Sequence, residues 1–277
     1  MNTNALEGRT LLMSGGSRGI GLAIALRAAR EGANVAFIAK TSEPDPRIPG
    51  TVHSAAAAIE EAGGNALPIV GDVRDENAVL AAVDKTVEKF GGIDIVVNNA
   101  SAITLTGFGE LPIKRYDLMF DINVRGTFAL TSAALPHLLK SPDARVLTLS
   151  PPLNLDPKWF RTFSPYTASK YAMTMLTLGV AEQYRDAGIT ANCLWPETLI
   201  ATAAVQNIVA GAEGIQSSRR PEIMADAAGI VLTRPKDVGS GECLIDAEVL
   251  RGAGVADLSA YAYEGAAESD LEMDLFI

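Results

Sequence analysis

Seven short runs of aliphatic and β-branched residues alternate with longer stretches of helical pattern, and this alternation restricts the fold more than any other feature. Several runs are continuously apolar, as strands covered on both faces are. Strands and helices in alternation predict βαβ units, and therefore an α/β fold with a doubly wound parallel sheet of seven strands. The runs are Thr10 to Met13, Asn34 to Ala39, Ala66 to Val70, Ile93 to Val97, Arg145 to Leu149, Thr190 to Leu194 and Cys243 to Ile245.

Helices are predicted between these runs, and several are followed by a glycine where a helix commonly ends. The glycines in question are Gly32, Gly63, Gly91 and Gly188. No linker rich in proline or glycine and no internal repeat divides the 277 residues, so we expect a single domain over residues 1–277. The predicted helices are Leu22 to Glu31, Val52 to Ala62, Glu76 to Phe90, Ile113 to Lys140 and Tyr166 to Asp186.

Three segments do not fit the alternating pattern. Residues 41–50 contain three prolines, so they extend the connection after the second strand and cannot be helical. Residues 201–235 are small and polar, and a segment of that length after the sixth strand is predicted to be partly helical and to act as a substrate lid. The acidic tail, residues 264–277, is expected on the surface or against a neighbouring subunit.

Charge and composition exclude several classes of function. A formal net charge of −10 argues against a nucleic-acid partner or an anionic membrane surface, since both require a positive field. The chain has no run near the roughly 18 apolar residues of a membrane span, and its N-terminus lacks a secretory signal, so we expect a soluble cytoplasmic protein. Two cysteines, Cys193 and Cys243, and two histidines predict neither a disulfide framework nor a metal site.

A glycine-rich turn follows the first predicted strand and opens the first predicted helix. Glycine lets the backbone approach a phosphate closely, and the helix N-terminus offers free N–H groups and partial positive charge to a pyrophosphate. The turn therefore predicts a Rossmann-type dinucleotide site. Its candidate cofactor-binding residues are Gly15, Ser17, Arg18, Gly19, Ile20 and Gly21.

The end of the second strand indicates which dinucleotide is bound. A Rossmann half that binds NAD usually carries an acidic residue there, which holds the ribose 2′-OH. Here Ala39 is followed by Lys40, and Arg18 in the glycine turn supplies a second cation. Two cations suit a 2′-phosphate, so the sequence favours NADP(H) over NAD(H).

Tyr166 and Lys170 lie four residues apart in a predicted helix, which brings the phenol and the ammonium to one face. A positive charge within about 4–6 Å favours the phenolate, so Lys170 is predicted to lower the pKa of Tyr166. Tyr166 is therefore the candidate general acid and base. A pair of surface residues at this spacing is the alternative.

At this point the chain resembles the short-chain dehydrogenase/reductase family, from Gly8 to about Ile245. The motifs are the glycine turn, Gly71-Asp72-Val73, Asn98-Asn99-Ala100, Asn123 and the pair Tyr166 and Lys170. Within the family, residues 150–154, the proline-rich insertion and Leu194-Trp195-Pro196 resemble the hydroxysteroid dehydrogenase-like 2 group, and no sterol-carrier domain is expected after them.

The resemblance implies a role for each matching position. Asp72 and Val73 would contact the adenine, Asn98, Asn99 and Ala100 would line a cofactor ribose, and Pro196 would lie at the nicotinamide pocket. Asn123 would hold a water that links Lys170 to solvent. Lys170 would bind the nicotinamide ribose, and Tyr166 would exchange a proton with the substrate oxygen while the cofactor carries the hydride.

The sequence departs from the family at a catalytic position. The family places a serine about thirteen residues before its tyrosine, and here that position is Leu153, while the register after the fifth strand gives Pro151. Ser150 is the candidate donor, with a structural turn serine as its alternative and Asn154 or Ser164 as substitutes. Ser101 stands where glycine is usual. Glu197 follows Pro196, and we interpret it as a loop carboxylate that faces solvent.

These observations predict an NADP(H)-dependent oxidoreductase that interconverts a carbonyl and a secondary alcohol. Its substrate is expected to be small and apolar, and the long helices resemble those through which the family forms homodimers and homotetramers. The alternative is an NADP(H)-binding regulator or scaffold with little turnover, and a sugar-nucleotide epimerase is a weaker third. The apolar residues expected beside the cleft, unless they are core or subunit contacts, are Leu153, Leu155, Trp159, Phe160, Phe163 and Trp195.

Overall fold

The computed structural model describes residues 4–45 and 49–277. Within these ranges seven strands form one parallel sheet in the order β3-β2-β1-β4-β5-β6-β7. The α/β fold with a doubly wound parallel sheet is therefore confirmed, and the strand boundaries differ from the predicted ones by at most two residues. The strands are β1 Thr10–Ser14, β2 Asn34–Ala39, β3 Asn65–Val70, β4 Ile95–Asn98, β5 Arg145–Thr148, β6 Thr190–Trp195 and β7 Cys243–Ile245.

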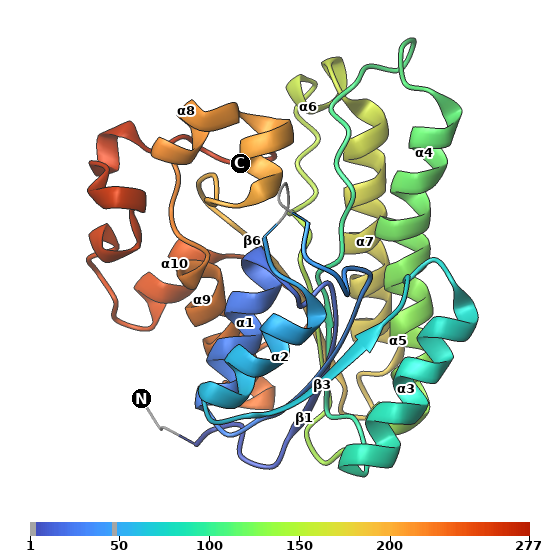
Figure 1. The fold of residues 1–277 in the computed structure, drawn as a ribbon. Helices are drawn as coiled ribbons and strands as arrows, with labels where there is room; N and C mark the ends of the chain where they lie inside the picture. The colour runs from blue at the N-terminus through green and yellow to red at the C-terminus, as the bar shows by residue number, and fades with distance from the viewer. Residues whose placement is uncertain (1–3, 46–48) are drawn as a thin grey trace.

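Helices cover both faces of the sheet, with α1, α2 and α9 on one side and α3, α4, α5 and α7 on the other (Figure 1). The predicted helix over residues 113–140 is continuous but contains a π-helical turn, η1. The helices are α1 Gly19–Arg30, α2 Val52–Glu61, α3 Glu76–Phe90, α4 Ile113–Phe120, η1 Asp121–Arg125, α5 Gly126–Leu138, α6 Lys158–Arg161, α7 Ser164–Gln183, η2 Val205–Val209, α8 Gly211–Gln216, α9 Glu222–Thr233 and α10 Asp246–Gly252.

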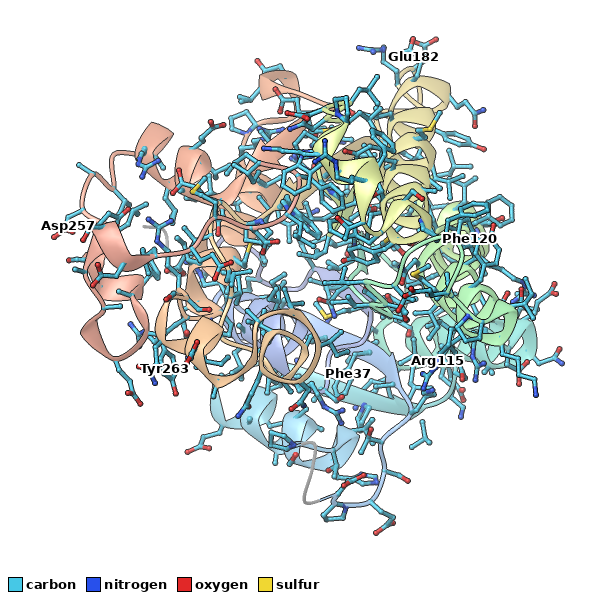
Figure 2. All side chains as sticks on the ribbon, turned by 90° about the horizontal axis from the view of Figure 1, so that it is seen from above. Phe37, Arg115, Phe120, Glu182, Asp257 and Tyr263 are labelled. Atoms are coloured by element: carbon cyan, nitrogen blue, oxygen red, sulfur yellow. The ribbon has the colours of Figure 1, made fainter. Side chains whose placement is uncertain are left out.

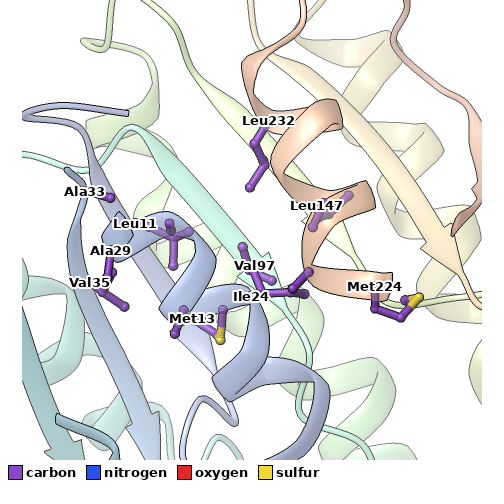
Figure 3. Packing of buried hydrophobic residues seen from close by; sticks show 14 of the residues in the cluster. Leu11, Met13, Ile24, Ala29, Ala33, Val35, Val97, Leu147, Met224 and Leu232 are labelled. Carbon is purple, nitrogen blue, oxygen red and sulfur yellow. The ribbon is translucent and has the colours of Figure 1, made fainter. Parts of the chain in front are cut away.

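The two faces of the sheet bury two separate hydrophobic clusters. Leu11 and Met13 of β1 belong to the cluster under α1 and α9, whereas Leu12 belongs to the cluster under α3 and α5. This division follows from the period of two in a strand, which sends successive side chains to opposite faces. Figure 3 shows the first cluster, in which Ile24 of α1 and Met224 of α9 point toward the strands.

Local sequence explains where several helices begin and end. The Thr51 hydroxyl accepts a hydrogen bond from the backbone N–H of Ser54 at 3.1 Å, and the Ser54 hydroxyl accepts one from the backbone N–H of Thr51 at 2.9 Å, which forms a capping box before α2. The Asp75 carboxylate caps α3 by accepting a hydrogen bond from the backbone N–H of Asn77 at 2.9 Å. At the other end of α3, Gly91 adopts a φ of 86°, a left-handed conformation that residues with a Cβ disfavour.

The segment predicted as a lid, residues 201–235, divides into two parts. Its first part contains η2 and α8 and borders the cavity described below. Its second part forms α9, whose buried face, including Ile223 and Ala227, packs on α1. The prediction that the whole segment is a lid is therefore wrong for α9, because the pattern of small apolar residues that suggested a mobile cover instead allows close packing of two helices.

The proline-rich insertion forms no helix over its described residues, 41–45 and 49–50, and residues 46–48 lie outside the described part of the chain. No helix in the described ranges is long and apolar enough to cross a membrane.

The C-terminal tail was predicted on the surface or on a neighbouring subunit, and for its last residues this is wrong. Figure 2 shows Asp257 and Tyr263 at the edge of the molecule on the side opposite Arg115 and Phe120. From that edge the chain turns inward, and Phe276 becomes 1% exposed in a third hydrophobic cluster beside α7. An acidic composition did not predict this course, because the apolar end of the tail is only three residues long.

Candidate active site

The carboxyl ends of the strands border a cavity of about 700 Å³. In open α/β sheets this is the edge at which ligands bind. Each of the first six strands is followed within two residues by one that lines the cavity, namely Gly15, Lys40, Asp72, Asn99, Leu149 and Pro196. The topology thus brings residues from most of the chain to one site.

The glycine turn after β1 has the shape that a phosphate requires. Gly15 has a φ of 76°, and a Cβ added to Gly21 would lie 2.4 Å from the carbonyl oxygen of Gly15. The residue before α1, Arg18, makes no side-chain cap to the helix, so the first N–H groups of α1 keep no side-chain partner at the cavity edge. A tight turn and an uncapped helix N-terminus fit the pyrophosphate of a dinucleotide.

Asn99 fixes the glycine turn to β4. Its Nδ2 donates hydrogen bonds to the carbonyl oxygens of Ser14 at 3.1 Å and Gly15 at 2.8 Å. Asn98, in contrast, is buried and donates from Nδ2 to the hydroxyl of Thr131 at 2.9 Å. Asn98 therefore acts within the sheet, and it does not line the cavity.

Two cations border the cavity near the end of β2, as predicted from Arg18 and Lys40. Arg18 donates to the carbonyl oxygen of Gly50 at 2.8 Å, which connects the insertion to the glycine turn. Lys40 Nζ lies 3.6 Å from a carboxylate oxygen of Asp72, which also pairs with Arg74 at 2.7 Å. Burial opposes ionisation of Asp72, but the hydrogen bonds from Arg74 and the charge of Lys40 lower its pKa.

With two exceptions, the residues predicted to bind the cofactor line this cavity. The exceptions are Asn98, which is buried within the sheet, and Gly21, whose missing side chain allows the close approach of the turn described above. Val73 and Ala100 are among the lining residues, together with Gly15, Ser17, Arg18, Gly19, Ile20, Lys40, Asp72, Asn99, Tyr166, Lys170 and Pro196.

Tyr166 and Lys170 both lie at the buried end of the same cavity, in the first turns of α7. Each side chain is 2% exposed. Lys170 Nζ donates a hydrogen bond to the carbonyl oxygen of Leu149 at 2.6 Å and lies 4.9 Å from the ring centroid of Trp195. Burial lowers the pKa of Lys170 to about 7, against the opposing charge of Asp274.

The predicted lowering of the Tyr166 pKa is not what the structure gives. Burial of the phenol, and after it the negative charge of Asp274, raise the pKa of Tyr166 above its ordinary value. The spacing argument considered only the positive charge of Lys170 and left out desolvation, which acts against both charged forms. Tyr166 therefore holds its proton at neutral pH.

Ser150, the predicted donor to the substrate oxygen, does not reach the cavity. Its side chain is 0% exposed and lies beside the thiol of Cys193, and Ser150 is absent from the described residues that line the cavity. Pro151 follows it, and the backbone there directs the hydroxyl toward β6. Of the two substitutes, the Asn154 side chain donates to the carbonyl oxygen of Phe276 at 3.1 Å, and Ser164 begins α7 away from the cavity.

Asn123 lies in the π-helical turn η1 and is fully buried. Its Oδ1 accepts a hydrogen bond from the N–H of Ala102 at 2.7 Å, and its Nδ2 donates to the hydroxyl of Ser169 at 3.0 Å. Its carbonyl oxygen accepts one from Thr127 at 2.6 Å. These bonds hold the loop after β4 against α7, and the predicted water of Asn123 stays a prediction.

Most of the apolar residues expected beside the cleft lie elsewhere. Only Trp195 among them lines the cavity, while Leu155 is 73% exposed and Phe160 and Leu153 are each 41% exposed. Trp159 and Phe163 pack around Phe276 instead. The alternative of core packing therefore holds for Trp159 and Phe163, because the tail places Phe276 against them.

No sequence motif predicts that the C-terminal tail belongs to the site. Asp274 and Leu275 line the cavity together with Tyr166 and Lys170. The indole N–H of Trp195 donates to the carbonyl oxygen of Leu275 at 2.8 Å, so β6 holds the tail in place. More than 100 residues separate the tail from Tyr166, and no motif connects them.

Glu197 does not face solvent, which corrects its interpretation as a loop charge. Its carboxylate is 19% exposed and accepts hydrogen bonds from Arg219 at 2.8 Å and from Arg251 at 2.8 Å. Burial of the carboxylate opposes its ionisation, yet the two guanidinium groups lower its pKa. Glu197 thus anchors the loop after β6, whereas Asp274 lines the cavity together with Tyr166 and Lys170.

Among the residues that the structure describes, no group of three or more histidine, cysteine, aspartate or glutamate side chains could hold a metal ion.

Comparison with known proteins gives a family and near relatives. A family model described as short chain dehydrogenase matches residues 9–213. Hydroxysteroid dehydrogenase-like protein 2 from Xenopus tropicalis is 53% identical over 262 residues, which are 94% of this chain and 62% of the relative. The chain thus spans about three fifths of the length of these curated relatives.

Solved structures agree with this relationship. A short chain dehydrogenase from Mycobacterium thermoresistibile is 54% identical, with a TM-score of 0.91 over 98% of this chain and 95% of that one. Two further solved structures, each 21% identical to this chain, share its fold. One is a metagenomic short-chain oxidoreductase in complex with NADP, with a TM-score of 0.72 over 87% of this chain and 98% of that one. The other is carveol dehydrogenase from Mycobacterium avium in complex with NAD, with a TM-score of 0.76 over 88% of this chain and 97% of that one.

Proposed function

Because the chain belongs to the short-chain dehydrogenase family, with hydroxysteroid dehydrogenase-like proteins among its relatives, we propose that it is an NADP(H)-dependent oxidoreductase that interconverts a carbonyl and a secondary alcohol. One observation carries the proposal. Tyr166 and Lys170 line the same cavity as the glycine turn that fits a pyrophosphate. Because proteins of this family bind NAD(P), we infer that the glycine turn is the cofactor site and that the proton donor Tyr166 lies in the same cavity.

Each residue has a task in this proposal. The free N–H groups of α1 and the glycine turn bind the pyrophosphate, and Asp72, Val73 and Ala100 border the adenosine end. Lys170 and Pro196 lie at the nicotinamide end. When bound, the dinucleotide supplies or accepts the hydride. The protein positions the substrate, excludes water and moves the proton.

Tyr166 acts as the general acid in the direction of carbonyl reduction. Its raised pKa keeps the phenol protonated at neutral pH, which is the form that can donate to a carbonyl oxygen. After the transfer, Lys170 supplies a proton to the phenolate of Tyr166. It can do so because an amine whose pKa lies near 7 exchanges protons readily at neutral pH. Reduction is therefore the direction that the site favours.

NADP(H) is the proposed cofactor because two cations stand where the 2′-phosphate would lie. Arg18 and Lys40 both border the cavity beside Thr41 at the end of β2. Asp72 lies 3.6 Å from Lys40 and also pairs with Arg74 at 2.7 Å, so its charge is shared between cations, and the charge of Asp45 acts on Arg18. A phosphate has access to both cations, and a charge-assisted hydrogen bond is about twice as strong as a neutral one.

A small apolar substrate and a homo-oligomer complete the proposal. Ile103, Ile122 and Leu149 are among the apolar residues that line the cavity. On the outer surface, Phe128 of α5 is 59% exposed and Met175 of α7 is 63% exposed. Exposed apolar residues on neighbouring helices are typical of subunit contacts, so we propose a homodimer or homotetramer built through α5 and α7.

The test is NADPH oxidation by the wild-type protein over a panel of small apolar ketones and aldehydes, compared with Tyr166→Phe. Removing the proton donor is expected to lower turnover by about 10²–10⁴-fold and to leave the Kd of NADPH within about threefold. Tyr116→Phe, on the exposed helix α4, is the matched control and should leave turnover unchanged. Turnover that survives Tyr166→Phe would remove the catalytic assignment.

The burial of Ser150 favours a second candidate, an NADP(H)-binding regulator or scaffold with little turnover. Without a second donor, the site loses stabilisation of the developing oxyanion, which costs about 10²–10³ in rate elsewhere. NADPH that binds tightly and is oxidised with no carbonyl on the panel would support this candidate. Measurable oxidation that depends on Tyr166 would exclude it.

A further inference from the structure

The last seven residues are held against the cavity from two directions. In the loop after β6, the N–H of Leu199 donates to the carbonyl oxygen of Glu272 at 2.9 Å, and the carbonyl oxygen of Glu197 accepts a hydrogen bond from the N–H of Asp274 at 3.0 Å. From the loop after β5, Asn154 donates to the carbonyl oxygen of Phe276 at 3.1 Å. The tail is therefore a fixed wall of the site.

The ring of Phe276 anchors this wall. It is 1% exposed and lies 6.1 Å from the ring of Tyr166, 5.9 Å from Trp195 and 5.4 Å from Trp159, between ring centroids. Aromatic pairs at these distances are worth about 0.5–1.5 kcal/mol each beyond the area they bury. Its φ of 75° is unusual for a residue with a side chain, and it turns the ring into the cluster.

Two residues before that anchor, the Asp274 side chain lines the cavity beside Tyr166, Lys170 and Leu149. One carboxyl oxygen accepts a hydrogen bond from the N–H of Leu275 at 2.6 Å, which fixes the carboxyl group. No ion pair joins Asp274 to a described cation. The second carboxyl oxygen is thus available to a group inside the cavity.

Electrostatics keep this carboxyl neutral near physiological pH. Burial raises the pKa of Asp274 to about 8, the charges of Asp246 and Glu272 add to the increase, and Lys170 opposes it. A carboxyl with this pKa holds its proton below about pH 8, so it is a hydrogen-bond donor in that range. Above about pH 8 it ionises and can only accept.

We infer that the carboxyl of Asp274 donates the second hydrogen bond to the substrate carbonyl oxygen, in the role that the buried Ser150 does not fill. The inference rests on the proposed function and adds a residue to it. A neutral carboxylic acid in an apolar site can stabilise a developing oxyanion, as the acid of an oxyanion hole does.

The step balances with Asp274 as a donor that keeps its proton. The carbonyl carbon gains the hydride from reduced nicotinamide, and the oxygen gains the phenolic proton of Tyr166. Asp274 shortens its hydrogen bond to that oxygen while negative charge grows on it. The products are the alcohol, oxidised nicotinamide and a phenolate, which regains a proton through Lys170.

Three substitutions distinguish hydrogen-bond donation by Asp274 from an effect of its charge and from a purely structural role. Asp274→Ala removes the donor and the charge, whereas Asp274→Asn removes the charge but keeps an N–H donor of the same size. Asp270→Asn is the matched control, because Asp270 lies four residues away in the same tail with an exposed side chain and is not among the charges that act on Asp274. NADPH oxidation at pH 6 and NADPH affinity are measured for each.

We expect Asp274→Ala to lose about 10²–10³-fold in kcat at pH 6, the size of a lost oxyanion donor, and Asp274→Asn to stay within about tenfold of wild type. Wild-type reduction should slow as pH rises through about 8, where Asp274 ionises. Equal rates for Asp274→Ala and Asp274→Asn would overturn the inference, since charge alone would then account for the effect.

Tail docking is followed in the same proteins by tryptophan fluorescence. The chain has two tryptophans, Trp159 and Trp195, and the ring of Phe276 contacts both. Unchanged emission in Asp274→Ala, together with the loss in kcat, supports donation by Asp274. A loss in kcat that occurs only with a shifted emission would assign Asp274 a structural role and overturn the inference.

A readout without turnover distinguishes this inference from the proposed function. Carbon-13 NMR of aspartate-labelled protein, with the Asp274 signal assigned by its loss in Asp274→Asn, should show a carboxyl that is protonated at pH 7. Titration below about pH 5 overturns the inference whatever the kinetics. Wild-type protein that oxidises NADPH with no carbonyl contradicts the proposed function, and the NMR result still decides whether Asp274 can donate.

Discussion

The two ends of the cavity are built in different ways. At the nucleotide end, the glycine turn and the residues after β2 lie within about 30 positions of one another, and short backbone contacts such as that of Gly21 with Gly15 define the shape. At the substrate end, Leu149, Tyr166 and Asp274 come from three distant segments, and desolvated titratable groups define the chemistry. Local sequence therefore specifies binding, and tertiary packing specifies reactivity.

The lysines at the two ends of the cavity also differ in their environment, since one is exposed and the other is buried. Lys40 is 58% exposed and pairs with Asp72 at 3.6 Å, so solvent and a counterion moderate its field. Lys170 is 2% exposed, and burial shifts its pKa to about 7. A substitution at the nucleotide end should therefore change cofactor affinity, and one at the substrate end should change turnover. The predictions below test this separation.

Of the three substitutions that compare the two ends of the cavity, Gly21→Ala is expected to have the largest effect. A Cβ there would lie 2.4 Å from the carbonyl oxygen of Gly15, a distance that forces the turn to move. Overpacking of this kind costs about 1–3 kcal/mol, and the upper end corresponds to roughly a 100-fold increase in the Kd of NADPH. Isothermal titration calorimetry measures that Kd directly.

Gly92→Ala is the control, since no atom lies within 4 Å of a Cβ at that glycine. Its Kd for NADPH should match the wild-type value. A Gly21→Ala protein with unchanged NADPH affinity would contradict the assignment of the turn to the pyrophosphate, and with it the claim that short backbone contacts determine binding at this end.

An intermediate effect is expected from Phe276→Ala. Loss of the ring removes its contacts with Tyr166, Trp159 and Trp195, and the tail that carries Asp274 should then detach locally. We expect the KM for an apolar carbonyl to increase about tenfold, because the free energy of one to two lost aromatic pairs corresponds to a factor of that size. Steady-state kinetics and tryptophan emission measure the two consequences.

Phe108→Ala provides the matched control, because Phe108 is 87% exposed and lies outside the cavity. The Kd of NADPH should stay at the wild-type value in both variants. If Phe276→Ala weakened NADPH binding as much as it raised the KM, the two ends of the cavity would not be separable.

The difference between the two ends also explains what could be predicted from sequence. Strand periodicity and helix-ending glycines located all seven strands, and the turn before Gly21 identified the nucleotide end, because each of these signals is local. Tyr166 and Lys170 were found through their four-residue spacing, but the direction of the Tyr166 pKa was not, since burial is set by residues far along the chain.

The remaining errors share this cause. Ser150 is predicted from its place directly after the fifth strand, but the path of the backbone after β5 turns its hydroxyl toward Cys193. The tail was judged by its acidic composition, although its position depends on hydrogen bonds to Trp195 and Asn154. Neither outcome follows from composition or spacing, because each depends on contacts between segments that are far apart in sequence.

The smallest effect is expected from Lys40→Ala, and it sharpens the comparison because it should act on one cofactor only. Lys40 borders the cavity where the 2′-phosphate of NADPH would lie, and NADH has a hydroxyl there. A hydrogen bond to a charged group is worth about 1.5–3 kcal/mol, and the exposure of Lys40 places the loss at the lower end, or roughly tenfold in the Kd of NADPH.

The Kd of NADH should stay within about twofold in Lys40→Ala, and Lys85→Ala, an exposed lysine on α3, should change neither value. Added salt should reduce the difference between wild type and Lys40→Ala, because exposed charges are screened at an ionic strength near 1 M. Equal losses of NADPH and NADH affinity would mean that Lys40 acts through Asp72 and the shape of the adenosine end, and the proposed preference for NADP(H) would then rest on Arg18 alone.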